Sequence, residues 1–161
     1  MIGLDAGIND DGENKNVFVG YSAGKFNDAG SHNIAIGHKA GAKNTIGNRN
    51  VSIGDEAGLF NVTGSNNVNI GFQSGMFSKK SNNTFIGFRT GTKTIGDGNT
   101  FIGFRAGEEA ATEANLGQEP SLNTIIGHEA GIKSKHHRNT FIGAKTATNL
   151  ESSSFNTVVG N

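Results

Sequence analysis

The residues of this chain that could do chemistry gather in two short segments of its second half. Lys133-Ser134-Lys135-His136-His137-Arg138 is basic, and such a run can hold an anionic glycan or a phosphate. Before it, the segment between Gly107 and Asn123 carries acidic residues and no basic one. Solvated turn charges without a ligand are the alternative for both segments. The candidate binding residues are Lys133, Lys135, His136, His137, Arg138, Glu108, Glu109 and Glu113.

No arrangement typical of a catalytic or metal site accompanies these charges. His38 and His128 occupy equivalent places in the repeat described below and could bind a metal or an anion near a symmetry axis, but the sequence supplies no partner ligands. The chain has no Cys, which excludes thiolate metal sites. The sequence contains no recognisable triad of nucleophile, base and orienting residue, and no phosphate-binding fingerprint. We therefore expect no enzyme activity, no cofactor and no metal.

Composition narrows the classes of partner. The net charge is zero, which argues against a nucleic-acid binder. No apolar run is long enough to cross a bilayer, and the N-terminus lacks the features of a signal peptide, so we expect no membrane insertion. The chain begins inside a repeat unit at Ile2 and stops inside another at Asn161. We expect residues 1–161 to be one piece of a longer fibrous protein.

A repeat of 16 or 17 residues organises the whole chain. Asn83-Thr84-Phe85-Ile86-Gly87-Phe88-Arg89-Thr90-Gly91 returns as Asn99 to Gly107 with one change. The glycine in the fifth position of the unit recurs at 3, 20, 37, 54, 71, 87, 103, 127, 143 and 160, and one step of 24 residues interrupts the period. That step marks an insertion at 108–122, and insertions in solenoids map to loops on one face.

The pattern inside each unit predicts an all-β parallel β-solenoid. Apolar residues alternate with period two over positions two to four, as in a short strand, and glycines supply two turns. We expect two short strands per coil and about ten coils, because 16 or 17 residues are too few for a helical repeat. Stacked coils would align the first-position asparagines into a structural ladder: Asn16, Asn33, Asn50, Asn67, Asn83, Asn99, Asn123, Asn139 and Asn156.

The orientation of the strand positions decides which residues are free for assembly. The fourth position is the most uniform apolar column, so we expect it to face the interior together with the Val or Thr of the second position. The third and sixth positions then point outward and leave much apolar surface exposed. We expect these columns to pack around a three-fold axis. The predicted trimer-interface residues are Phe18, Phe72, Phe85, Phe88, Phe101, Phe104 and Phe141.

Units such as NTFIGFRAG and NIAIGHKAG resemble repeats of known trimeric fibres. They are similar to the head repeats of YadA-like trimeric autotransporter adhesins and to NTFIG-containing segments of bacteriophage and bacterial tail fibres. The resemblance implies a homotrimer of left-handed β-rolls that attaches to a host surface, and an extracellular location at a cell surface or a virion or tail-fibre tip. The coils here are longer than is common in adhesin heads.

The sequence favours a binding module over three alternatives. We expect a segment of a trimeric fibre that attaches to a host-surface glycan or protein receptor. A passive spacer would only set the length of the fibre. A hexapeptide-type acyltransferase with His128 as base would need coils of another length and three aliphatic corners. Ice binding would use the column Thr84, Thr100, Thr124, Thr140 and Thr157, but these share a face with the invariant Ile and are expected to point inward.

Overall fold

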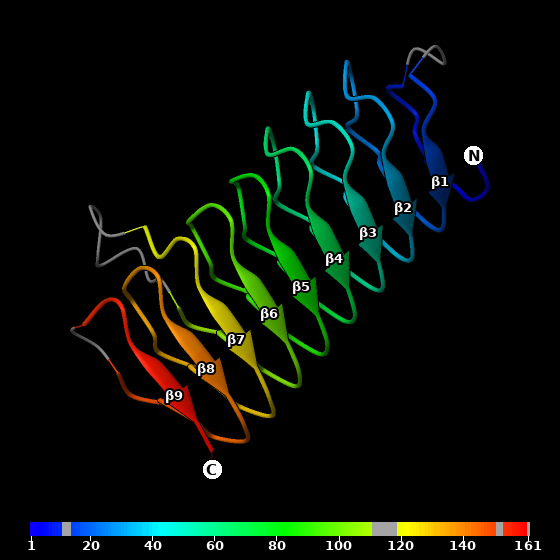
Figure 1. Ribbon diagram of the computed structural model, residues 1–161. Helices are drawn as coiled ribbons and strands as arrows, with labels where there is room; N and C mark the ends of the chain where they lie inside the picture. Colours follow the sequence, from blue (N-terminus) through cyan, green and yellow to red (C-terminus); the bar gives the residue numbers. More distant parts are fainter. Residues whose placement is uncertain (11–13, 111–118, 151–152, 161) are drawn as a thin grey trace.

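The chain folds into a parallel β-solenoid (Figure 1). In this computed structural model, residues 1–10, 14–110, 119–150 and 153–160 are described. Each coil contributes one strand of three residues to a single nine-stranded sheet whose strands lie in chain order. The strands are β1 (Val17–Val19), β2 (Ile34–Ile36), β3 (Val51–Ile53), β4 (Val68–Ile70), β5 (Thr84–Ile86), β6 (Thr100–Ile102), β7 (Thr124–Ile126), β8 (Thr140–Ile142) and β9 (Thr157–Val159).

Equivalent residues of successive coils lie directly beside one another. Val17 pairs with Ile34, and the same parallel register continues through every strand pair to Thr140 and Thr157. Ile2 extends the sheet by one bridge to Val19. At about 4.8 Å per strand, β1 and β9 lie about 40 Å apart, and the two termini lie at opposite ends of the rod (Figure 1). The predicted parallel β-solenoid is confirmed.

The predicted second strand of each coil is wrong for the described residues. After the strand, the chain turns at a glycine and returns through a series of turns. Besides the ninth-position glycine, such as Gly58 with φ 59°, two further positions of the coil adopt a left-handed conformation that a strand cannot accommodate. They are the seventh position, such as Glu56 with φ 55°, and the residue before the asparagine, such as Arg49 with φ 55°. These bends let the return segment close a coil that has only one extended side.

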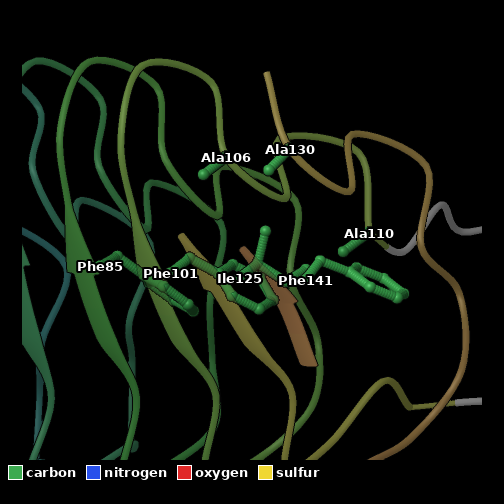
Figure 2. Packing of buried hydrophobic residues seen from close by; sticks show 7 residues of the cluster. All are labelled: Phe85, Phe101, Ala106, Ala110, Ile125, Ala130 and Phe141. Atoms are coloured by element: carbon green, nitrogen blue, oxygen red, sulfur yellow. The ribbon is translucent and has the colours of Figure 1, made fainter. Parts of the chain in front are cut away.

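The two faces of each strand are oriented opposite to the prediction. The third position is buried, and Phe18, Phe85, Phe101 and Phe141 form the core instead of a trimer interface. Only Val158, in the terminal strand β9, is exposed in this column. Phe85, Phe101, Ile125 and Phe141 form a row along the axis, with Ala106, Ala110 and Ala130 packed against it (Figure 2).

The physical reason lies in how narrow the coil is. The Phe101 ring lies so close to Gly107 that a Cβ there would clash with it, so in this coil the large third-position side chain fills the space that a ninth-position side chain would need. In the first half the third position shrinks to Ala35, Ser52 and Asn69. A buried asparagine at the twelfth position of the coil, such as Asn44, shares that part of the interior. The core therefore changes from partly polar in the first half to aromatic in the second.

The regular coil extends into the predicted insertion from both sides. The Glu109 backbone N–H donates to Ile132 O at 2.8 Å, and the Pro120 carbonyl accepts from Asn99 Nδ2 at 2.8 Å. Glu108–Ala110 and Pro120–Leu122 thus belong to coils, and the extra length lies between 111 and 119. Among the described residues, no helix has the length and apolar character needed to cross a membrane.

Candidate interaction surfaces

The outer face of the sheet is a flat, uncharged surface. It consists of the second and fourth positions of every unit, which are the first and third residues of each strand, and all eighteen are Val, Ile or Thr. None of them is buried: those of the central strands, such as Ile70, are half-buried, and most of those near the ends are exposed, up to 70% at Val159. The threonines Thr84, Thr100, Thr124, Thr140 and Thr157 lie here, so the prediction that they point inward is wrong.

A ridge of aromatic rings lies beside this face, two residues beyond each of the strands β4 to β7. Phe72, Phe88, Phe104 and His128 stack in sequence with centroid distances of 5.2, 5.3 and 4.9 Å. The three phenylalanines are about 40% exposed, at 40%, 43% and 41%. Of the predicted interface residues, Phe72, Phe88 and Phe104 therefore do lie on the outside.

The first-position asparagines form a buried ladder. From Asn33 onward, each backbone N–H donates to the side-chain Oδ1 of the asparagine one coil earlier, at 2.7 Å from Asn33 to Asn16 and 3.0 Å from Asn156 to Asn139. Several side-chain amides also donate to the turn, as Asn50 Nδ2 does to Gly64 O at 2.9 Å. A second column of buried asparagines, in addition to the predicted ladder, comprises Asn27, Asn44 and Asn61.

The acidic candidates are largely engaged within the chain. The Glu108 side chain is 3% exposed and bonds Arg89 Nε at 2.7 Å and also Arg105 Nε. This hydrogen bond to the carboxylate raises the pKa of Arg105. Glu109 lies 3.9 Å from Lys93 Nζ, and Glu113 lies outside the described residues. Because Glu108 is buried and paired, it is not available to a partner.

The basic candidates run along the second turn of one coil. Lys133 and Arg138 are exposed, and the Arg138 guanidinium lies 5.2 Å from the Phe155 ring. His137 Nδ1 accepts from the Ser121 backbone N–H at 3.3 Å. Lys135 and His136 are half-buried and both interact with other residues. The segment therefore offers Lys133 and Arg138 as its accessible cations.

The two sixth-position histidines have different surroundings. His38 Nδ1 lies 2.8 Å from Asp55 Oδ1, whereas His128 stacks on Phe104 and its Nδ1 lies 3.9 Å from Glu129 Oε2. In the part of the chain that the structure describes, no three His, Asp or Glu side chains gather as a metal site would require. The His128 ring continues the stack of the ridge through Phe104.

A surface hollow that the sequence analysis did not identify lies in the first half of the rod. It has a volume of about 440 Å³ and lies over the return segments that follow β1, β2 and β3, with Met76 of the next coil at its edge. Its lining is mixed aromatic, aliphatic and basic, with Tyr21, Lys39, Ala42, Lys43, Leu59 and Phe60 among its residues. The signal for it was present in the sequence, since Ala42 is the smallest residue of the tenth-position column.

No protein-family model, curated protein or solved structure matches this chain.

Proposed function

We propose that this chain is a segment of a homotrimeric surface or tail fibre that attaches to a host surface. The observation that carries the proposal is the outer face of the sheet, where eighteen of eighteen positions are Val, Ile or Thr and none is charged. At about 40 Å by about 10 Å, this strip approaches the largest apolar patches that lone soluble proteins expose. The ring ridge beside it enlarges the apolar surface further.

Two adjoining but different apolar surfaces favour a ring over a dimer. In a two-fold dimer the same patch meets itself, whereas in a ring each copy offers one surface to each neighbour. The strip and the ridge of Phe72, Phe88 and Phe104 are separated only by the turn glycine, such as Gly87 before Phe88. Parallel rods in register would pack the ridge of one copy on the strip of the next.

The attachment part of the proposal is supported by the residues that would stay exposed after the strip is covered by neighbouring copies. The solenoid is rigidly registered along its length, so residues on the return segments would be displayed outward in three copies. Among them are Lys133 and Arg138. The resemblance of the repeats to fibre and adhesin heads supports the same function.

Sedimentation equilibrium of the chain tests the proposal. We expect a mass of about three times the 16.8 kDa chain. Ile70→Lys, in the middle of the strip, should give a folded monomer, because three lysines would be buried around the axis without partners. Thr63→Lys on an exposed turn is the matched control and should remain trimeric. A monomeric parent chain would overturn the proposal, as would an Ile70→Lys chain that stays trimeric.

A second candidate function, ice binding, is favoured by one specific observation. Thr84, Thr100, Thr124, Thr140 and Thr157 lie side by side in register on the outer face, where regularly spaced hydroxyl and methyl groups could order water. This function needs the strip uncovered, so it and the trimer exclude each other. Thermal hysteresis in a monomeric sample, lost on Thr100→Lys, would favour it.

A further inference from the structure

We infer that the hollow over Ala42 binds the carboxylate of an acidic saccharide. This inference rests on the attachment part of the proposed function, and it names a site and a ligand class for it. The hollow's volume of about 440 Å³ lies within the range of small-molecule sites.

Small buried residues create the floor of the hollow. Between Lys39 and Lys43 the chain runs through Ala40, Gly41 and Ala42, all buried. The tenth-position residues of the two neighbouring coils, Lys25 and Leu59, have longer side chains than Ala42 and line the hollow on either side of it along the rod. The two lysines therefore flank a depression that their own coil leaves unfilled.

The same place in a later coil shows which group fits. There the tenth position is Glu108 in place of Ala42, and its buried carboxylate bonds Arg105, the seventh-position residue of its own coil. Lys39 is the residue equivalent to Arg105. Arg105 also pairs with Glu129 of the next coil at 3.1 Å, and Glu56 is the residue equivalent to Glu129. The first half of the rod thus keeps one of the two cations that hold Glu108, with Lys39 in place of Arg105 and Ser22 in place of Arg89, and it lacks the tenth-position carboxylate.

The charge of the hollow is available to a ligand. Lys25 is committed to Asp5, whose carboxylate lies 2.8 Å away and raises the pKa of this lysine. Lys39 and Lys43 form no ion pair within the described residues. Lys43 Nζ instead lies 4.5 Å from the centroid of the Phe60 ring. An anion at Ala42 would meet these two cations, and the Glu56 carboxylate, which also lines the hollow, already accepts a hydrogen bond from Gln73 Nε2 at 2.9 Å.

The walls favour a sugar over a peptide. Tyr21 is 48% exposed and stacks on His38, and its ring can pack against the apolar face of a pyranose. The Phe60 ring is less available, because Phe77 stacks on it at 4.8 Å and Lys43 Nζ lies over it. The backbone offers nothing for an extended peptide to pair with, because Phe26 N–H donates to Ala42 O at 2.8 Å and Lys43 N–H to Leu59 O at 3.0 Å. Recognition therefore falls to side-chain charge and ring stacking.

Isothermal titration of the parent chain with trigalacturonic acid and with its methyl ester tests the inference at physiological salt. The acid should bind and the ester, which lacks the charges, should not. Lys39→Gln and Lys43→Gln should each weaken binding about tenfold, because hydrogen bonds to charged groups are the stronger ones. Lys93→Gln is the control, since Lys93 occupies the position equivalent to Lys43 but lies beside Glu109.

Ala42→Glu provides a test that does not remove any proposed contact. The new carboxylate should occupy the hollow as Glu108 does in its coil, so binding should be lost while the thermal midpoint is kept or raised. Unchanged binding by Ala42→Glu, equal loss with Lys93→Gln, or no binding of the acid by the parent would overturn the inference. Equal binding of tetraglutamate would overturn the choice of a saccharide. Sedimentation of the same samples distinguishes these failures from failure of the trimer.

Discussion

At the scale of single residues, the asparagines of the ladder differ in how many hydrogen bonds their side chains make. Asn67 uses its whole side chain: Oδ1 accepts from Asn83 N–H at 2.9 Å, and Nδ2 donates to Lys80 O at 2.8 Å. Asn83 Oδ1 accepts from Asn99 N–H at 2.9 Å, but its Nδ2 has no partner among the described residues. The two positions therefore separate the value of the acceptor from that of the donor.

Replacing each of these asparagines by aspartate should give different losses of stability. Asn67→Asp turns a donor into a carboxylate oxygen facing the Lys80 carbonyl, whereas Asn83→Asp loses no hydrogen bond. We expect the free energy of unfolding to fall about 1–3 kcal/mol further for Asn67→Asp, measured by guanidinium unfolding at neutral pH. At about pH 3 the protonated carboxyl can donate again, and the difference should shrink. Equal losses at neutral pH would show that Nδ2 contributes nothing.

The turn glycines are required because of both conformation and contact. Gly54 has φ 129°, and a Cβ there would lie 2.6 Å from the carbonyl oxygen of Gly71 in the next coil. Gly41 has φ 54°, and a Cβ there would meet nothing closer than Ala35 Cβ at 3.5 Å. We expect Gly54→Ala to lower the free energy of unfolding by about 3 kcal/mol or more and Gly41→Ala by about 1 kcal/mol. Guanidinium unfolding of the two variants measures this, and equal losses would contradict it.

At the scale of the element, the orientation of the strand decides the function of every phenylalanine. A buried phenylalanine such as Phe101 should cost about 3–5 kcal/mol when truncated to alanine, because it leaves a cavity in the row. Phe72, an outer ring of the same type, should cost about 1 kcal/mol or less in a monomeric background such as Ile70→Lys. Thermal or guanidinium unfolding of Phe101→Ala and Phe72→Ala in that background compares them. A larger loss at Phe72 would reverse the assigned faces.

The sequence allowed the period, the parallel stacking and the asparagine column to be predicted, because each leaves one residue type at a fixed interval. The faces were assigned wrongly because the uniform Ile column is more apolar than the variable third position. Alternation along a strand puts positions one and three on the same side. Had Asn83 been taken as buried, Phe85 would have followed it inward. The variation from Ala35 to Phe101 reflects the size of the interior at each coil.

The candidate surfaces were less predictable than the fold. From the sequence, Glu108 is predicted to be an exposed acidic residue. The stacking of adjacent coils in the structure shows that Arg89 and Arg105 enclose it. The hollow over Ala42 likewise depends on side chains from several coils. Because spacing along the chain identifies columns but not the depth between them, such surfaces require coordinates.

At the scale of the whole molecule, the rod is a linear array whose local stability should follow its local core. In repeat proteins each unit contacts only its neighbours, so stability is a sum of local terms. The second half contains the continuous row Phe85, Phe101, Ile125 and Phe141, whereas the first half has Ala35, Ser52 and Asn69 in that column. The terminal strand β9 is exposed at all three residues.

We therefore expect amide hydrogen exchange to be slowest in β5 to β7 and faster in β2 to β4 and β9. The expected difference in opening free energy is about 2 kcal/mol or more between Phe101 and Ser52, because burying a large aromatic side chain contributes more than burying a small polar one. Hydrogen exchange followed by mass spectrometry on the Ile70→Lys monomer measures it without trimer contacts. Uniform protection along the rod would mean that it unfolds as one cooperative unit, and the strongest protection in β2 to β4 would mean that the asparagines of the first half, and not the phenylalanines, hold the array together.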